Sequence, residues 1–168
     1  QEIKTMLPIF LSIISDYPNY NFVIAGVNNV DPKLYNLAAY SNLYIIYNKT
    51  YDLLTNSFAA IVTSGTASLE CSLFKVPQLV CYKTSDISYF IGKLFVKIRH
   101  ISLVNIILEK DIVKELIQSD FNKKNLAFEF NKLCEQETRS KIIQEYSKIF
   151  DLLSVRDTSK KIASSIIS

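Results

Sequence analysis

The chain has 168 residues, of which 49% are hydrophobic and 21% are charged, and its formal net charge is +3 at pH 7. These proportions are typical of a globular domain and exclude an intrinsically disordered segment. The mild positive charge lacks the dense lysine and arginine stripe of nucleic-acid-binding proteins, so we expect no nucleic-acid partner. No apolar run approaches the roughly 18 residues of a spanning helix. With a single histidine, His100, we expect no metal site, and we expect no cofactor.

Three cysteines, Cys71, Cys81 and Cys134, show no CxxC spacing. An odd number of cysteines without a recognisable secretion signal favours reduced thiols in a cytoplasmic protein. We therefore interpret them as small buried hydrophobic residues.

Short apolar segments alternate with helical patterns along most of the chain. An apolar face at helical spacing opens the sequence, and Asp31-Pro32 is a good helix start. The predicted strands are 21–27, 43–47, 58–62 and 77–82, with an extended segment around 100–104. The predicted helices are the opening segment, 31–39, 49–56, 66–75, 86–97, 111–118, 122–136, 139–154 and 158–167.

This alternation predicts an α/β fold, a Rossmann-like doubly wound parallel sheet with helices on both faces. Residues 1–138 are expected to form this domain, with a C-terminal helical tail over 139–168. Such a fold normally places a strand before its first helix, so we expect that strand and its loop to be missing from the sequence. Ligands of such folds bind at the carboxyl ends of the strands.

The strongest local signal lies where the third predicted strand meets its helix. Gly65 permits a positive φ or a close approach of the backbone to a ligand. Ser64 can cap the helix, whose first N–H groups attract an anion with about 0.3–1 kcal/mol from the helix dipole. Glu70 lies one to two turns further on, where its carboxylate can accept hydrogen bonds from ribose hydroxyls. The residues expected around a diphosphate are Ser64, Gly65, Thr66, Ala67 and Ser68.

Alternatives stay open for each of these residues. Small residues at a strand–helix turn also serve packing alone. The GxGxxG and GxxxxGK[ST] patterns do not occur, which argues against NAD binding and against an ATPase. A structural hydrogen bond is favoured over catalysis for His100. Asn105, in the apolar stretch SLVNIIL, either forms a turn or contacts a ligand. The stretch 87–98 is interpreted as a core-facing helix, with contact to a membrane interface as the alternative.

The run from Ser64 to Pro77, SGTASLECSLFKVP, closely resembles the SGTA[ST]LE…LFK.P block of lipid-A-disaccharide synthases. Further stretches resemble patterns of this family in the same order and spacing: Val80 to Lys83, Tyr89 to Lys97, Ile101 to Ile107, Val113 to Gln118, and Glu2-Ile3 with Leu7-Pro8 at the start. The resemblance spans essentially the whole chain. Two positions depart from it, since Val104 stands where the family usually has proline and Glu109 falls near a usual glycine.

The resemblance implies a glycosyltransferase of the GT-B type, with this chain as the C-terminal, donor-binding half. The family transfers diacylglucosamine from UDP-diacylglucosamine to diacylglucosamine 1-phosphate, which gives the lipid A disaccharide and UDP without a bound metal. The catalytic residues are expected in the N-terminal domain, so we expect this chain to be inactive alone. The UDP-sugar site that the resemblance implies comprises Ser64, Gly65, Thr66, Ala67, Ser68, Glu70, Tyr82, Asn105 and Glu2.

The resemblance also implies a cytoplasmic protein, peripheral at the cytoplasmic face of the inner membrane. The tail 139–168 is expected to pack on the other domain or on the partner in a homodimer. Another nucleotide-sugar enzyme of the GT-B type, an epimerase or a muramyl-pathway transferase, is the alternative function. A flavodoxin-like receiver module would need a phosphorylatable aspartate at the end of a central strand. The strands run instead into Val27-Asn28-Asn29, Asn48-Lys49-Thr50 and Ser64-Gly65-Thr66.

Overall fold

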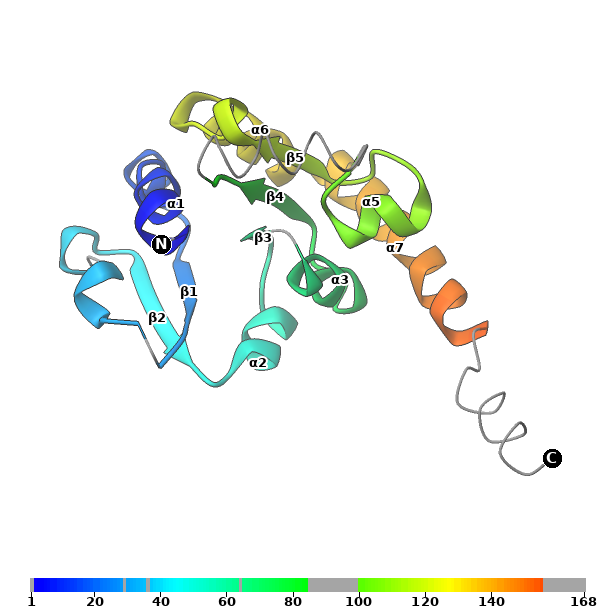
Figure 1. Ribbon diagram of the computed structural model, residues 1–168, viewed down its shortest axis with the longest axis horizontal. Helices are drawn as coiled ribbons and strands as arrows, with labels where there is room; N and C mark the ends of the chain where they lie inside the picture. Colours follow the sequence, from blue (N-terminus) through cyan, green and yellow to red (C-terminus); the bar gives the residue numbers. More distant parts are fainter. Residues whose placement is uncertain (1, 29, 36, 64, 85–99, 156–168) are drawn as a thin grey trace.

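A computed structural model describes residues 2–28, 30–35, 37–63, 65–84 and 100–155 of the chain. All strand pairing among these residues is parallel (Figure 1). Strand β1 (Phe22–Gly26) pairs with β2 (Leu43–Tyr47). A second sheet has the order β3 (Ala60–Thr63), β4 (Gln78–Tyr82), β5 (Lys114–Ile117). The parallel strands with interleaved helices confirm the predicted Rossmann-like α/β class.

The helices alternate with these strands along the chain. They are α1 (Glu2–Leu11), α2 (Thr50–Thr55), α3 (Thr66–Leu73), α5 (Leu103–Leu108), α6 (Lys123–Cys134) and α7 (Gln136–Val155). The described residues also form the short 3₁₀ helices η1 (Ile14–Asp16), η2 (Pro32–Tyr35), η3 (Leu37–Ala39) and η4 (Gln118–Asp120). No helix among the described residues is long and apolar enough to span a bilayer. The helices expected at 86–97 and 158–167 lie outside the described residues.

Two predicted helices are wrong. The segment 31–39 forms the tight turns η2 and η3, with the Leu34 N–H donating to the Asp31 carbonyl in a 3₁₀-type bond. The segment 111–118 forms β5 and η4. Its apolar residues Val113, Leu116 and Ile117 suit one helical face as well as a strand, and pairing with β4 decides the outcome.

Two predicted strand segments differ from the structure by two residues or more. Strand β3 starts at Ala60 instead of Phe58, because its pairing with β4 begins at Ala60, opposite Gln78. The Phe58 carbonyl accepts a hydrogen bond from the Arg139 guanidinium at 3.2 Å. Of the extended segment expected around 100–104, only Ser102 makes a single bridge, to Gly65. Helix α5 begins directly afterwards at Leu103, since the Ser102 side chain accepts from the Asn105 N–H and caps it.

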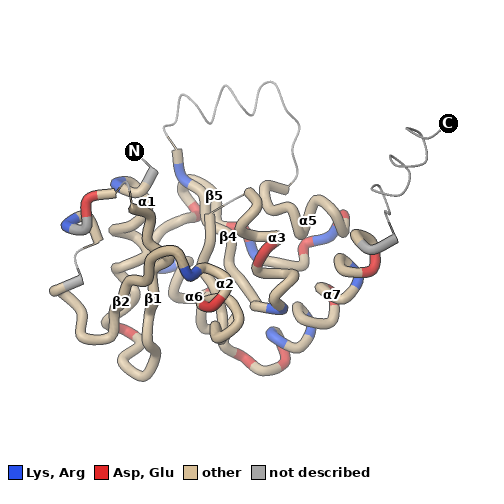
Figure 2. Tube along the Cα trace, turned by 90° about the horizontal axis from the view of Figure 1, so that it is seen from below, with Lys and Arg blue, Asp and Glu red and all other residues tan. Residues whose placement is uncertain are grey.

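The largest core lies between the β3–β4–β5 sheet and helices α6 and α7. It buries Val80 and Cys81 of β4 against Leu126 of α6 and Ile149 of α7. A smaller core lies under α1 and β2 and contains Leu7, Leu11, Ile14, Tyr35 and Leu43. Basic and acidic residues alternate along the length of α7 (Figure 2).

Helix α7 packs on this domain's own core over most of its length. Ile142, Tyr146 and Ile149 are buried, and the helix contacts α3, α5 and α6. Toward its end Phe150, Leu152 and Leu153 are exposed. The first half of the predicted tail therefore packs on this domain. That the exposed end packs on another domain or on a dimer partner stays a prediction.

Cys71 and Cys81 are buried, as expected, and no cysteine among the described residues forms a disulfide. Burial raises the pKa of the Cys71 thiol from 9.0 to about 12, with a further contribution from the Glu70 charge. Burial also raises the pKa of Cys81. The unfolded chain loses these protons at lower pH than the folded chain does. The contribution of the protonated thiols to the free energy of unfolding is therefore fully present below about pH 9 and is lost as the pH rises toward about 12.

We therefore expect the free energy of unfolding to fall between pH 9 and 12, with about 1.4 kcal/mol per pH unit from each fully titrating thiol. Cys71→Ser removes one such thiol, so its curve of unfolding free energy against pH should be flatter by up to this amount. Urea titrations at several pH values measure both slopes. Equal slopes for the two proteins would contradict the raised pKa of Cys71.

Candidate functional site

The turn between β3 and α3 is built around a glycine. Gly65 precedes the helix with φ 108° and ψ −152°, a conformation that is essentially confined to glycine. The positive φ predicted for it is confirmed. Within the part of the chain that the structure describes, no side-chain hydrogen bond caps the start of α3. Ser64, the expected cap, lies outside the described residues.

Ser68 holds this turn from inside. Its side chain is 0% exposed, and its hydroxyl donates to the Gly65 carbonyl at 2.9 Å and accepts from the Leu103 N–H at 3.0 Å. The expectation that Ser68 touches a diphosphate does not fit this geometry, because protein groups use its hydroxyl. Ser68 instead ties the start of α3 to the start of α5. The exposed Thr66 and the half-buried Ala67 lie beside it at the surface.

Asn105 uses both ends of its amide within the protein. It is 1% exposed, its carbonyl oxygen accepts from the N–H groups of Ile112 and Val113, and its amide nitrogen donates to the Val113 carbonyl and to Glu115. All four distances are 2.9–3.0 Å. Of the two alternatives left by the sequence, this geometry supports the turn-forming one.

Glu115, which the sequence did not single out, anchors the same region. Its carboxylate accepts from the N–H groups of Ile101 and Ser102 at 3.0 Å and from the Asn105 amide. Ser102 in turn bridges to Gly65. Thus Glu115 on β5 holds the loop that lies against the glycine turn.

Helix α5 ends at Glu109, which has the left-handed conformation with φ 53°. This position falls near the glycine of the family pattern, and glycine adopts this conformation without strain. We expect Glu109→Gly to raise the free energy of unfolding by about 0.5–1 kcal/mol, whereas Glu109→Ala should not. Urea denaturation compares the two variants. An equal effect of both substitutions would contradict backbone strain at Glu109.

Glu70 lines an open cavity of about 420 Å³ at the carboxyl end of β2. The other lining residues are Asn48, Lys49, Thr50, Tyr51 and Asp52. Glu70 is half-buried on α3, and the opposite wall comes from the β2–α2 loop and the start of α2. The Tyr51 ring stacks on Phe74 with 5.4 Å between centroids and 14° between planes, which joins α2 to the end of α3. The cavity therefore lies one to two helical turns from Gly65.

The lining residues of the β2–α2 loop were missed by the sequence analysis. Asn48 follows β2 directly, has φ 57°, and its side-chain oxygen accepts from Asn28 at 3.4 Å. Both residues follow strands β1 and β2, so the loops after these strands meet at one edge of the sheet. Their position after predicted strands was the only local signal.

The two remaining predicted site residues lie at other places. Tyr82 is the half-buried last residue of β4 and therefore lies at the carboxyl edge of the β3–β4–β5 sheet. Glu2 is the first residue of α1, and its side chain is outside the described part of the chain.

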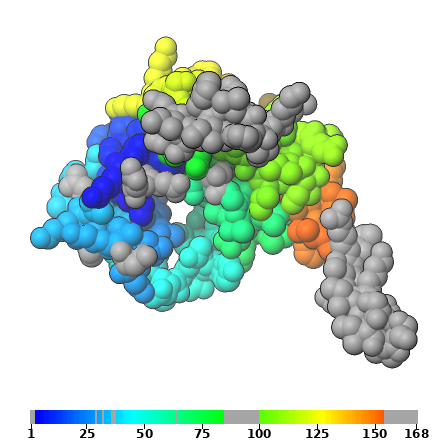
Figure 3. Space-filling view, in the orientation of Figure 1, coloured from blue at the N-terminus to red at the C-terminus, as the bar shows by residue number. Residues whose placement is uncertain are grey.

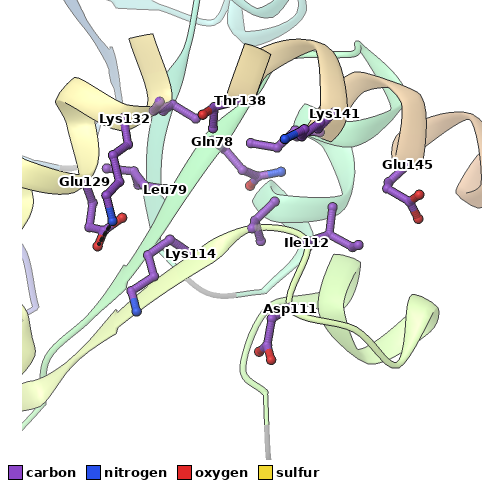
Figure 4. A pocket seen from close by; sticks show the side chains of 13 residues that line it. Gln78, Leu79, Asp111, Ile112, Lys114, Glu129, Lys132, Thr138, Lys141 and Glu145 are labelled. Atoms are coloured by element: carbon purple, nitrogen blue, oxygen red, sulfur yellow. Dashed lines mark ion pairs between the residues drawn. The ribbon is translucent and has the colours of Figure 1, made fainter. Parts of the chain in front are cut away.

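A second cavity of about 390 Å³ lies between β4, β5, α6 and α7 (Figure 4). Gln78 and Lys114, the first residues of β4 and β5, place it at the amino ends of the strands, away from Gly65. The Lys132 ammonium lies 3.5 Å from the Glu129 carboxylate, and that of Lys141 lies 2.6 Å from Glu137. Neighbouring carboxylates thus offset its positive charge, and we do not assign the predicted anion site to it.

Comparisons with known proteins identify relatives of this chain. The chain is 33% identical over 156 residues to a lipid-A-disaccharide synthase of Nitrosococcus oceani, and the aligned region covers 88% of this chain and 40% of that protein. It is 43% identical over 101 residues to the corresponding protein of Syntrophus aciditrophicus, covering 60% of this chain and 26% of that protein. A relative from Histophilus somni is 29% identical over 180 residues, covering 99% of this chain and 46% of that protein.

The chain thus spans less than half the length of these relatives. A family model described as lipid-A-disaccharide synthetase matches residues 1–167. Because this match covers nearly the whole chain, the protein belongs to the lipid-A-disaccharide synthetase family.

Proposed function

We propose that this chain binds the UDP part of a UDP-linked sugar. The observation that carries the proposal is the cavity that joins Glu70 to the loop Asn48–Asp52, one to two helical turns from the Gly65 turn. A diphosphate at the start of α3 places the nucleoside toward this cavity. The Glu70 carboxylate is then in reach of the ribose hydroxyls, and the loop after β2 borders the base.

The chemistry of the turn suits a diphosphate that leaves during transfer. Negative charge grows on the diphosphate as the bond to the sugar breaks, and fixed N–H groups at a helix start stabilise that charge. Gly65 allows the backbone to approach closely, since apart from its chain neighbours no heavy atom of the described residues lies within 4 Å of the position that a Cβ would take. Ser68, Asn105 and Glu115 keep the turn in this geometry as positioning residues.

We propose that the whole protein transfers diacylglucosamine from UDP-diacylglucosamine to diacylglucosamine 1-phosphate. The family membership supports this reaction over an epimerase or a muramyl-pathway transferase. The base that deprotonates the acceptor hydroxyl is expected from a part of the relatives that lies beyond their match to this chain. Because both substrates carry acyl chains, we also propose peripheral binding at the cytoplasmic face of the inner membrane, and association as a homodimer.

Calorimetric titration of the 168-residue chain with UDP tests the binding proposal. We expect saturable binding of UDP, weaker binding of UMP because it lacks one phosphate, and no turnover of UDP-diacylglucosamine with its acceptor. Equal affinity for UDP and uridine would contradict a diphosphate site at Gly65. Turnover by this chain alone would contradict the expected place of the base.

A further inference from the structure

The cavity at the amino ends of β4 and β5 is separate from the proposed nucleotide site. Its volume of about 390 Å³ is within the range of small-molecule sites, and its walls come from β4, β5, the loop before β5, α6 and α7. The hollow in the space-filling view lies elsewhere, between the blue and cyan part of the chain and the green part (Figure 3). Much of the cavity wall is apolar, with Leu79, Ile112, Val113, Leu133 and Ile142. An occupant of this cavity therefore needs an apolar body.

Gln78 places a polar side chain in this wall. It is 0% exposed and points from β4 toward α7 (Figure 4). Its amide nitrogen donates to the Ser68 carbonyl at 2.8 Å and to the Tyr146 hydroxyl at 2.9 Å. Rotating the amide by half a turn would place its oxygen against the Ser68 carbonyl oxygen, and two acceptors repel each other. The orientation of the Gln78 amide is therefore fixed.

The amide oxygen of Gln78 has no donor among the residues that the structure describes. Buried acceptors in native proteins are nearly always satisfied by protein, by ordered water or by a ligand. Gln78 lines the cavity, and protein groups already engage its nitrogen. Its oxygen is therefore the polar atom that it offers to an occupant.

The wall holds a second buried acceptor. One oxygen of the Glu145 carboxylate accepts from the Lys148 ammonium, whereas the other is buried without a donor among the described residues. Glu145 directly precedes Tyr146 in α7, the helix that the Gln78 side chain meets. Because both unsatisfied atoms are acceptors, the occupant must supply donors, and an anionic group would only add further acceptors.

The lysines of the wall do not meet this need. The ammonium groups of Lys132 and Lys141 are paired with neighbouring carboxylates of α6 and α7. Lys114 is exposed, and its side chain points away from Gln78 (Figure 4). Within the described part of the chain, the donor for the Gln78 oxygen must therefore come from an occupant of the cavity.

We infer that this cavity is a binding site for a small molecule with a primary ammonium group on a compact apolar body. An ammonium group has three donors, of which one satisfies the Gln78 oxygen, and the Glu145 carboxylate attracts its charge. The apolar body packs against Ile112 and Ile142. Because the Gln78 nitrogen holds the Ser68 carbonyl, the occupant also stabilises the start of α3. The inference does not depend on the proposed nucleotide site.

Amide chemical shifts of the 168-residue chain, followed by NMR at pH 7, test this inference. The probe is benzylammonium, and benzyl alcohol and benzoate carry the same ring with a neutral donor and with an anionic group. We expect saturable shifts with benzylammonium, with a Kd on the order of 1 mM. Benzyl alcohol should bind about tenfold more weakly, and benzoate should not saturate. The largest shifts are expected at Gln78, Ile112, Val113 and Ile142.

Two tryptophan variants form a matched pair. Thr138→Trp places a large ring at a half-buried position of the cavity wall on α7, whereas Ser147→Trp places it at an exposed position of the same helix. We expect Thr138→Trp to weaken benzylammonium binding at least tenfold and Ser147→Trp to leave it unchanged. Gln78→Met, which keeps the length of the side chain without its acceptor, should also weaken binding about tenfold.

Three results would overturn the inference. Benzyl alcohol or benzoate that binds as tightly as benzylammonium would exclude an ammonium site. Unchanged benzylammonium binding in Thr138→Trp, or shifts confined to residues outside the cavity, would exclude this location. No saturation by any of the three compounds would show that solvent alone meets the Gln78 oxygen.

Discussion

Replacing Asn105 with alanine is expected to lower the free energy of unfolding by about 3–5 kcal/mol. The amide makes four side-chain hydrogen bonds of 2.9–3.0 Å in a buried setting. Its removal leaves the Val113 N–H, the Val113 carbonyl and Glu115 without this partner, whereas the Ile112 N–H keeps its bond to the Lys110 carbonyl. Each unsatisfied buried group costs about 1–3 kcal/mol. The free energy of unfolding falls because these hydrogen bonds hold the turn that joins α5 to β5.

Urea denaturation of the two proteins measures this loss. Asn125→Ala is a matched control, because the Asn125 amide donates at the surface to the Asp120 carbonyl. We expect the control to lose at most about 1 kcal/mol. A loss of similar size in both variants would contradict the buried network around Asn105 and, with it, the role of Glu115 in holding the loop at Ser102.

The second large effect is expected on nucleotide affinity. Glu70→Ala should weaken UDP binding about tenfold to a hundredfold, because a hydrogen bond to a charged group contributes about 1.5–3 kcal/mol. Glu70→Gln should lose less, since the amide oxygen still accepts one hydrogen bond. The melting temperature should change little, because Glu70 borders an open cavity and is not part of the core.

Glu137→Ala is the control for charge alone. Glu137 is an exposed carboxylate on α7 and pairs with Lys141, and its pKa is lowered by the hydrogen bond from that lysine. Its removal should leave UDP affinity unchanged. Unchanged affinity of the Glu70→Ala variant would end the assignment of ribose to Glu70, and the glycine turn would then stand alone as the proposed contact.

Strands with continuous apolar sequence were predictable from local residues. Strand β2 coincides with the predicted segment Leu43–Tyr47, and β4 begins one residue later than expected. Strand β5 was predicted as a helix, because its short sequence fits both patterns and only the edge of β4 distinguishes them. The tight turns over 31–39 likewise depend on the burial of Tyr35 in the small core, which the sequence alone does not show.

Only the part of the candidate site whose residues are adjacent in the sequence was predictable. The conformation of Gly65 follows from the small residues around it, and the structure bears it out. Asn48 and Glu115 come from other parts of the chain and reach the site through sheet pairing. The position of Asn48 after a predicted strand was its only local signal, and no local pattern indicated Glu115. Ser68 and Asn105 were expected to meet a ligand, yet their polar atoms are buried and bound to protein groups, which makes them positioning residues.

Changes in backbone amide chemical shifts on addition of UDP test the central claim most directly. We predict the largest changes at Gly65, Thr66 and Ala67 and along the loop Asn48–Asp52, with saturation at one UDP per chain. The cavity between α6 and α7 provides the alternative location, and Lys114, Lys132 and Lys141 report on it. Largest changes at those lysines, or no change at saturating UDP, would contradict nucleotide binding at the Gly65 turn.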